Sequence, residues 1–386
     1  MAGVSRSTVS LAINNSPKVN EQTKLRILEI CKAVDYQPNM MARGLVAKST
    51  RTLCAVIPPI NQVFSHSYFT ETLRGIIEAC TARDFHLFVT VATESFKQQN
   101  SALRLFRAKR MDGALFIGAL NTDTYIRELM DKGCPTILVN TSIPGLPQVV
   151  ADNVTGTLQA MEHLHKLGHK RIGFIKGLDN VTTSVDRTEG FNLSRERFNL
   201  DRDRELVAFG NFSEQSGYEA MKQLLSIPKP PTAVFTTNDM MAIGAIQALR
   251  EAGKSVPKDM AIMGGDDILM ARYITPKLTT IRQDMHKIGF IAADLMLEAI
   301  VNETRSRSSA SSNGNASSSS NGNGHHAAGA AASALKLASA VGAVAIAEEE
   351  DELEPVMPIL TLDRQVVTTE LIVRESCGAV ASLDRA

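Results

Sequence analysis

The stretch GTLQAMEHLHKLGHKRIGFIKG, residues 156–177, decides the fold because it joins two kinds of secondary structure. Residues 156–169 predict a helix, and Gly168 near its end is typical of a helix C-terminus. RIGFIKG, residues 171–177, is a short apolar run typical of a buried strand. A helix that leads at once into a buried strand predicts an α/β fold.

The same alternation continues on both sides of this stretch. Toward the N-terminus we expect strands at 52–60, 86–93, 113–120 and 135–142 and helices at 73–85, 101–111 and 124–133. Toward the C-terminus we expect helices at 186–198, 216–227 and 240–253 and strands at 206–212, 232–239 and 260–267. Strands that alternate with helices predict parallel sheets covered on both faces. Two such series in tandem predict two α/β lobes with a cleft between them.

The composition is that of a soluble globular protein. The 386 residues are enough for two or three domains, and 44% of them are hydrophobic. The formal net charge is zero, but residues 1–51 hold eight Lys and Arg against three Asp and Glu, which predicts a nucleic-acid-binding N-terminal segment. The five cysteines are scattered without a CxxC pair, so free thiols in a reducing cytosol are favoured over a metal or redox motif.

Residues 304–353 depart from globular composition. Serine, asparagine and glycine dominate 304–326, and such residues bury too little surface to offset the entropy lost on ordering, so we expect a flexible loop there. The alanine-rich run that follows is too weakly hydrophobic for a membrane span. Strand-like sequence resumes at 357–377, which makes 304–353 an insertion within the fold.

The segment GVSRSTVSLAINN, residues 3–15, predicts a short helix with one polar face. Ser5 is the expected N-cap, and the residues expected to pack inward are Val9, Ala12 and Ile13. The other face carries side chains that suit phosphates and base edges in a DNA major groove: Arg6, Ser7, Ser10 and Asn14. A further helix is expected from residue 20 or 21, with a core stripe of Leu25, Ile27, Leu28 and Cys31. By itself this pattern fits a DNA-binding head and a small helical bundle equally well.

Longer motifs separate these two interpretations. VSRSTVSLAINN and the following VNEQTKLRILEICKAVDYQPNMMARGLVAKST closely resemble the lactose-repressor (LacI/GalR) family of transcriptional regulators. The resemblance continues through nearly all of the chain outside 303–352, in HLHKLGHKRIGFIKG, DRTEGF, PTAVFTTNDMMAIGA, SVPKDMAIMGGDD, ARYITPKLTTIRQD and ELIVRES. It implies a small all-α helix-turn-helix head and a hinge, followed by a two-lobed core of parallel sheets similar to periplasmic sugar-binding proteins.

The resemblance also implies the domain order. We expect an incomplete helix-turn-helix domain at 1–38, a hinge helix and linker at 39–51, an N-terminal lobe at 52–150, a C-terminal lobe at 151–280, a return to the N-terminal lobe at 281–303, the insertion at 304–353 and completing strands at 354–386. Family members carry a further helix before residue 1 of this chain. Either the start codon is assigned too late, or the chain is a truncation with impaired DNA binding; the otherwise intact DNA-binding segment favours the first interpretation.

DNA-contacting roles follow from the resemblance. Arg6 and Ser7 stand where family members read bases, and Leu11 occupies a third such position, where it can touch only a thymine methyl group. Next to the capping Ser5, the residues that match phosphate-contacting or register-holding positions are Thr8, Ser10 and Asn14. Asn39 to Ala47 matches the hinge helix, in which Leu45 matches a minor-groove wedge. The alternative for Leu45 is packing within a short linker helix.

Effector-binding roles follow in the same way. Arg187 lies where the family places an arginine over the ligand, and Asn238, Asp239 and Asp266 lie at strand ends, where open α/β sheets bind ligands. Aromatic positions that contact ligands in family members are matched by Tyr68, Phe69 and Phe212, and Asn140 and Met285 are further candidates. Asp239 and Asp266 also have a structural interpretation, because an Asp between a strand and a helix often caps the helix. Capping is favoured for Asp239, whereas ligand contact is favoured for Arg187 and Asp266.

The sequence therefore predicts a cytoplasmic transcriptional regulator, favoured as a repressor, that binds near-palindromic operator DNA as a homodimer and responds to a small effector, with a sugar favoured over a purine. It carries no nucleotide-binding glycine loop and no nucleophile elbow, so an α/β enzyme is disfavoured and no cofactor is expected. His165 and His169 could share a face of a helix, but with no acidic or cysteine partner expected beside them there, the cluster of His163, His165 and His169 is interpreted as surface residues and no metal site is predicted. The remaining alternative is a solute-binding module that has lost DNA binding.

Overall fold

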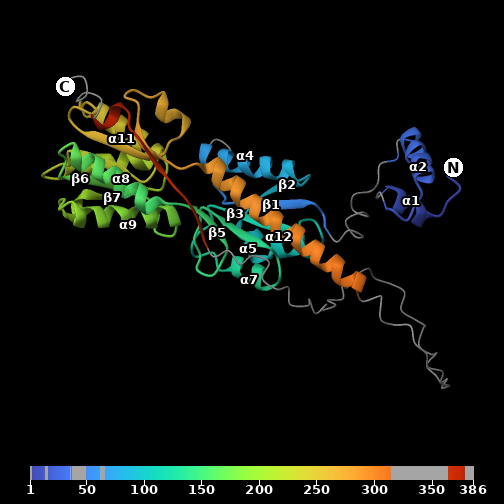
Figure 1. The fold of residues 1–386 in the computed structure, drawn as a ribbon. Helices are drawn as coiled ribbons and strands as arrows, with labels where there is room; N and C mark the ends of the chain where they lie inside the picture. The colour runs from blue at the N-terminus through green and yellow to red at the C-terminus, as the bar shows by residue number, and fades with distance from the viewer. Residues whose placement is uncertain are drawn as a thin grey trace, which may run out of the picture. The chain divides into compact units, whose positions relative to one another are not determined.

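The computed structural model describes residues 2–13, 16–34, 36, 49–60, 66–313 and 364–378, and for 303–313 it describes the backbone alone. Contacts divide the chain into two compact units, Met1–Arg51 and Thr52–Ala386. Figure 1 shows the helices and strands of each unit.

The first unit contains two helices, α1 (Arg6–Ile13) and α2 (Glu21–Ala33). Both begin at side-chain caps. The Thr8 amide donates to the predicted cap, Ser5 Oγ, at 3.1 Å, and the Thr23 amide donates to Asn20 Oδ1 at 2.8 Å, where the sequence predicts the helix to start at residue 20 or 21. The buried residues of this unit are Ala12, Val19 and Ile27, against which Val9, Ile13 and Cys31 pack.

The predicted core stripe of α2 is wrong for two of its four residues. Leu25 is 59% exposed and Leu28 is 42% exposed, whereas Ile27 is 1% exposed. The reason is helical geometry: Ile27 and Cys31 are four residues apart and share a face, while at about 100° per residue Leu25 and Leu28 are turned away from it. The described part of this unit therefore has a very small core.

The second unit contains two sheets, and the first belongs to the N-terminal lobe. Its strand order is β11-β5-β4-β3-β1-β2, and all of its pairs are parallel. The strands are β1 (Thr52–Ile57), β2 (His86–Val91), β3 (Gly113–Ile117), β4 (Thr136–Val139), β5 (Gln148–Ala151) and β11 (Gln365–Val367). The helices are α4 (Ser67–Ala82), α5 (Glu94–Gln98), α6 (Ser101–Arg107), α7 (Tyr125–Asp131) and α12 (Met285–Asn313).

Alternate residues of each central strand enter different cores on the two faces of this sheet. Leu53, Ala55 and Ile57 of β1 pack with α4 and α12, whereas Cys54 and Val56 pack with α5, α6 and α7. This explains why β1 is apolar throughout rather than alternating. Figure 1 shows α12 running beside α4 along the sheet.

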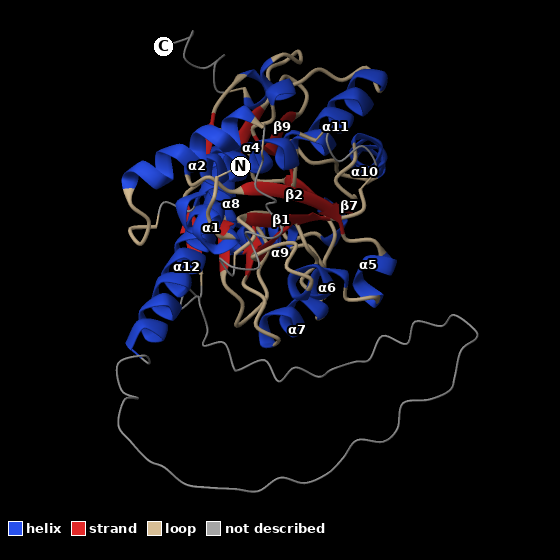
Figure 2. Ribbon diagram, turned by 90° about the vertical axis from the view of Figure 1, so that its right-hand side faces the viewer, coloured by secondary structure: helices blue, strands red, loops and turns tan. Residues whose placement is uncertain are grey.

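The second sheet has the strand order β12-β10-β9-β8-β6-β7. The strands are β6 (Ile172–Lys176), β7 (Val207–Phe209), β8 (Ala233–Thr236), β9 (Ala261–Asp266), β10 (Thr279–Arg282) and β12 (Glu370–Ile372). The helices are α8 (Asn153–Lys166) and α9 (Thr182–Arg197) on one face and α10 (Glu214–Ser226) and α11 (Asp239–Glu251) on the other, with short 3-10 turns at Arg204–Leu206, Leu269–Arg272 and Glu375–Cys377. Figure 2 shows the strands of the unit with helices around them.

Two features differ from the prediction. The second sheet is mixed, because β12 pairs antiparallel with β10 while the other pairs are parallel. Strand–helix alternation predicts parallel pairs because each helix returns the chain to the same end of the sheet. No helix lies between β11 and β12, so that pattern does not set the direction of β12. Helix α12 also continues to Asn313, so residues 304–313 are helical rather than loop. A helix that is already formed extends at little cost per residue.

The chain passes between the two sheets three times: from β5 to α8, from β10 to α12 and from β11 to β12. Two of these crossings are tied together, since the Asp152 amide donates to the Val367 carbonyl at 2.9 Å and Thr369 Oγ1 donates to the Asp152 carbonyl at 3.0 Å. Ends of strands from both lobes therefore meet where the crossings lie. Within the described residues, no helix is long and apolar enough to span a bilayer.

Candidate DNA-binding and effector-binding sites

The polar face of α1 is accessible, as expected of a DNA-reading helix. Arg6, Ser7 and Ser10 are exposed, and Leu11 is 37% exposed beside them. Ser5 Oγ lies 2.7 Å from Ser7 Oγ and 2.9 Å from Thr8 Oγ1, so the hydroxyl groups at the start of the helix form one cluster. Asn14, Asn39 and Leu45 lie outside the described residues.

In the second unit, Arg187 of α9 is the largest fully buried side chain among the described residues, at 1% exposure. Its guanidinium donates from Nε to Asn153 Oδ1 at 3.1 Å, from Nη1 to the Thr237 carbonyl, and from Nη2 to Asp266 Oδ1 at 3.1 Å. Gly265 permits this approach, because a Cβ at that position would lie 2.5 Å from Arg187 Nη1. Arg187 is thus held by three elements of the C-terminal lobe.

Asp266 ends β9 and is the acceptor of the site. Its Oδ1 accepts from Arg187 and from Gln283 Nε2, the latter at 2.6 Å. Burial raises the pKa of Asp266, and the Arg187 guanidinium opposes that rise. Its backbone φ is 128°, a conformation that L-residues rarely adopt and that costs about 1–3 kcal/mol. The surrounding bonds therefore hold this carboxylate in a strained position.

The prediction that favoured Asp239 as a helix cap is wrong. The cap of α11 is Asn238, whose Oδ1 accepts from the Met241 amide at 3.0 Å and whose Nδ2 donates to the Phe212 carbonyl at 2.9 Å. Asp239 is wholly buried and accepts from Thr280 Oγ1 at 2.5 Å and from the Ile268 amide at 2.9 Å. Burial, with the nearby Asp266 charge, raises its pKa to about 7. Both carboxylate oxygens of Asp239 are thus engaged by the protein.

The N-terminal lobe contributes Asn140, which follows β4 and is 3% exposed. Its Nδ2 lies 3.2 Å from Tyr68 Oη, 3.0 Å from Gln283 Oε1 and 3.8 Å from Met285 Sδ, while its Oδ1 accepts from the Ala151 amide at 3.1 Å. Burial raises the pKa of Tyr68, so its hydroxyl stays neutral. The Tyr68 ring meets Phe69 edge-on at 4.8 Å between centroids.

Phe212 belongs to the C-terminal lobe, where it is half-buried and has a φ of 70°. A Cβ on Gly177 would come within 2.6 Å of its ring and 3.1 Å of Ser184 Oγ, so the ring and this hydroxyl lie close to the same glycine. Ser184 is fully buried, and its Oγ has no hydrogen-bond partner among the described residues. Ser184 precedes Arg187 by three positions on α9, so both lie on one face of that helix.

Sequence reasoning missed four polar residues of this network: Asn153, Thr237, Gln283 and Ser184. Thr237 could have been found because it precedes Asn238 at the end of β8, and Gln283 because it follows β10 within the motif ARYITPKLTTIRQD. Asn153 and Ser184 carry no local signal. The structure brings together Tyr68, Asn140, Arg187, Asp266 and Met285 in one chain of contacts, with Phe212, Asn238 and Asp239 beside it.

The histidine prediction requires a correction. His163 Nε2 lies 3.3 Å from Cys377 Sγ, a cysteine neighbour 214 residues away in the chain. His165 stacks on Phe198 at 5.3 Å, and His169 Nδ1 lies 2.9 Å from Thr232 Oγ1. The three rings therefore have separate partners. Among the described residues, no group of three or more His, Cys, Asp or Glu could hold a metal ion.

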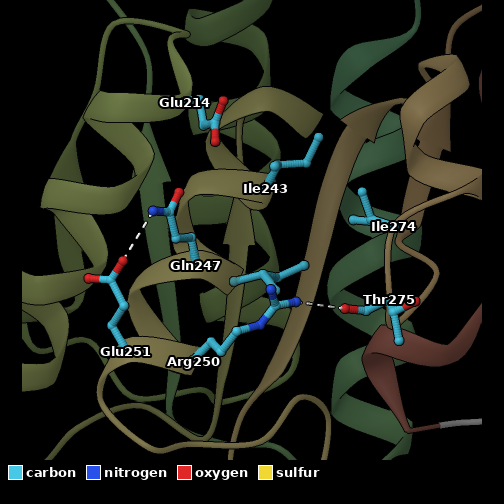
Figure 3. A pocket seen from close by; sticks show the side chains of 8 residues that line it. Glu214, Ile243, Gln247, Arg250, Glu251, Ile274 and Thr275 are labelled. Atoms are coloured by element: carbon cyan, nitrogen blue, oxygen red, sulfur yellow. Dashed lines mark hydrogen bonds between the residues drawn. The ribbon is translucent and has the colours of Figure 1, made fainter.

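A separate groove of about 550 Å³ lies on the C-terminal lobe. Figure 3 shows it between α11, which contributes Ile243, Gln247 and Arg250, and the segment of Ile274 and Thr275. Arg250 Nη2 donates to the Thr275 carbonyl at 3.3 Å across it. None of its lining residues belongs to the network around Arg187, so we do not assign the effector to it.

Comparison with known proteins agrees with this architecture. Residues 1–39 match the family model "Bacterial regulatory proteins, lacI family", and residues 161–312 match "Periplasmic binding protein-like domain". The probable HTH-type transcriptional repressor ExuR of Bacillus subtilis (strain 168) is 33% identical over 303 residues, which cover 78% of this chain and 89% of that protein.

Two solved structures share the fold. The complex of the transcriptional regulator CelR with cellobiose has a TM-score of 0.65 at 26% identity and covers 97% of both chains. The lac repressor dimer bound to operator and the anti-inducer ONPF has a TM-score of 0.74 at 21% identity and covers 97% of this chain and 96% of that one. The two units thus define a DNA-binding transcriptional regulator with an effector-binding core. This chain belongs to the lacI family of bacterial regulatory proteins.

Proposed function

We propose that this protein is a cytoplasmic, non-enzymatic repressor that binds a near-palindromic operator as a homodimer and is controlled by a neutral sugar or sugar derivative. The observation that carries the effector proposal is the polar network in which Asn140 of one lobe and Arg187 and Asp266 of the other are joined. Such a network changes its bonds when a polar ligand enters it, so ligand binding and lobe arrangement are coupled.

The chemistry of the network favours a neutral ligand that donates hydrogen bonds. Protein acceptors engage all three nitrogens of Arg187 and take three of its five N–H donors, which leaves one donor on each Nη, so a bidentate clamp on an anion would require the present bonds to break. Asp266 retains an accessible edge, with 14% of its side chain exposed, and an ionised carboxylate accepts from hydroxyl groups. The rings of Tyr68 and Phe212 offer flat apolar surfaces of the kind that pack on sugar rings. The similarity to a regulator solved with cellobiose supports the same class.

The DNA-binding proposal rests on the accessible face of α1. The full-length chain should select a preferred duplex from a random pool. Arg6→Ala should weaken binding to that duplex by about 1–3 kcal/mol, roughly 5- to 150-fold, and weaken binding to random duplex much less. Arg26→Ala removes the same charge from an exposed position of α2 and is the matched control, expected to affect both duplexes equally. Failure of both this chain and a version extended upstream to prefer any duplex, with ligand binding retained, would instead favour a solute-binding module.

The effector proposal is tested by calorimetric titration of the full chain with cellobiose, other neutral sugars, nucleosides and sugar acids. Binding of a neutral sugar that Asp266→Asn weakens at least tenfold supports the proposal. Binding of sugar acids alone, or binding that Asp266→Asn leaves unchanged, contradicts it. Measurement of the selected duplex with and without the bound ligand then gives the direction of regulation.

A further inference from the structure

Gln283 joins the two lobes through a single side chain. It follows β10 at the crossing into α12 and is 4% exposed. Its Oε1 accepts from Asn140 Nδ2 at 3.0 Å, and its Nε2 donates to Asp266 Oδ1 at 2.6 Å. Asn140 follows a strand of the first sheet, and Asp266 ends a strand of the second. The amide therefore bridges strand ends that belong to different lobes.

The neighbours determine which way this amide points. Asn140 must present its NH₂ group to Gln283, because its Oδ1 already accepts from the Ala151 amide. Asp266 must act as an acceptor toward Gln283, because Arg187 Nη2 donates to the same Oδ1. Position 283 consequently needs one acceptor and one donor in a fixed order. Glutamine meets this need, whereas leucine offers neither group and an ionised glutamate offers two acceptors.

Two other hydrogen bonds cross the lobe boundary nearby. The Ser142 amide donates to Thr182 Oγ1 at 2.9 Å, and the Asn121 amide donates to the Asn180 carbonyl at 3.0 Å. Ser142 lies two residues after Asn140, and Thr182 begins the helix that carries Arg187. These two amides thus report how the lobes meet, and Ser142 lies on the same chain segment as Asn140 of the Gln283 bridge.

We propose that Gln283 is a positioning residue that couples the Asp266 carboxylate to the arrangement of the two lobes. A change in the bonding of Asp266 is passed through Gln283 to Asn140, and from there to the contacts at Ser142 and Asn121. The regulatory meaning of this coupling rests on the proposed effector site, but the coupling itself does not require DNA or ligand.

Amide hydrogen exchange of the full chain, read residue by residue by NMR, tests the proposal. In Gln283→Leu we expect protection at Asn121 and Ser142 to fall at least tenfold, while amides within one sheet, such as that of Leu138, change less than twofold. The matched control is Gln148→Leu, which alters a buried glutamine of β5 that is 6% exposed and whose Oε1 has no hydrogen-bond partner in the described part of the chain. The control should leave both reporter amides unchanged.

A second variant, Gln283→Glu, separates the hydrogen-bonding role from simple packing. Its ionised carboxylate would face Asp266, near the charge of Arg187, the buried Asp239 and the neutral Tyr68. At pH 8 this variant should therefore lower the exchange protection of the Asn121 and Ser142 amides. Protonated glutamic acid both donates and accepts, so protection relative to wild type at the same pH should recover at pH 5.

Several outcomes overturn the proposal. Unchanged protection at Asn121 and Ser142 in Gln283→Leu overturns it, as does an equal loss in Gln148→Leu or the absence of any pH-dependent recovery in Gln283→Glu. The exchange experiment contains no DNA or ligand, so its result does not depend on the proposed function. A negative exchange result overturns the coupling even if operator binding is normal.

Discussion

Replacing Arg187 with methionine should strongly destabilise the C-terminal lobe. Methionine fills much of the buried volume but removes the guanidinium donors of the Asp266 carboxylate, the Asn153 side chain and the Thr237 carbonyl, so that Asp266 loses its cationic partner and keeps only the Gln283 amide as a donor. Removal of one partner from a buried ion pair costs about 3–5 kcal/mol, because the remaining charge is buried without compensation. We therefore expect the free energy of unfolding to fall by about that amount at neutral pH.

The effect should depend on pH in a defined direction. Loss of Arg187 removes the influence that lowers the pKa of Asp266, so burial raises that pKa further above its unfolded value. A carboxyl group with a raised folded pKa binds more protons in the folded protein, so its stabilising contribution is present at low pH and is lost as pH rises through the folded pKa. The variant should therefore be least impaired near pH 4 and most impaired at pH 8.

Urea unfolding followed by far-ultraviolet circular dichroism suits this protein, which contains no tryptophan. The matched control is Arg171→Met, since Arg171 pairs with the largely exposed Asp201 and Asp203 and such surface pairs contribute about 0–1 kcal/mol. The double variant Arg187→Met with Asp266→Asn should recover part of the loss. Equal costs for the two arginine variants, or no recovery in the double variant, would refute the reasoning.

Three further predictions concern other parts of the chain. Gly265→Ala should lower the free energy of unfolding by about 1–3 kcal/mol, because its methyl group would overlap the Arg187 guanidinium. Ile27→Ala should abolish the helical order of the first unit and its operator binding, whereas Leu25→Ala at an exposed position of the same helix should be nearly neutral. Asp239 has a folded pKa of about 7, so its contribution to stability is present at low pH and lost as pH rises through 7, and Asp239→Asn should flatten this dependence in urea unfolding.

Each of these has a clear contrary result. A Gly265→Ala variant as stable as wild type would mean that the backbone yields to the guanidinium. Equal effects of Ile27→Ala and Leu25→Ala on operator binding would show that burial does not distinguish them. An Asp239→Asn variant with the same pH dependence as wild type would assign the titration to another group.

Local patterns predicted much of the fold because they report interactions between residues close in the chain. The caps at Ser5 and Asn20 form within three residues, and the apolar run of β1 reflects burial on both faces. The same patterns failed for Leu25 and Leu28, where apolar character did not specify the buried face of α2. They also failed for 304–313, where composition suggested a loop but the preceding helix continues.

For the candidate site, family resemblance supplied positions and the structure supplied their bonds. It indicated Arg187, Asp266 and Asn140, and all three lie in one network. It did not indicate that Asn238 rather than Asp239 caps α11, nor that both carboxylate oxygens of Asp239 accept hydrogen bonds from protein donors. These assignments depend on burial and on groups brought in from other strands.

By itself, the sequence determined the order of helices and strands, the two α/β series and the polar face of α1, since periodicity and capping are local properties of the chain. Only the tertiary structure decided that Gln283 bridges Asn140 and Asp266, that His163 meets Cys377 and that β12 runs antiparallel to β10. Asn140 and Gln283 are 143 residues apart in the chain, and a hydrogen bond between them exists only after both sheets have formed and the crossings bring their strand ends together.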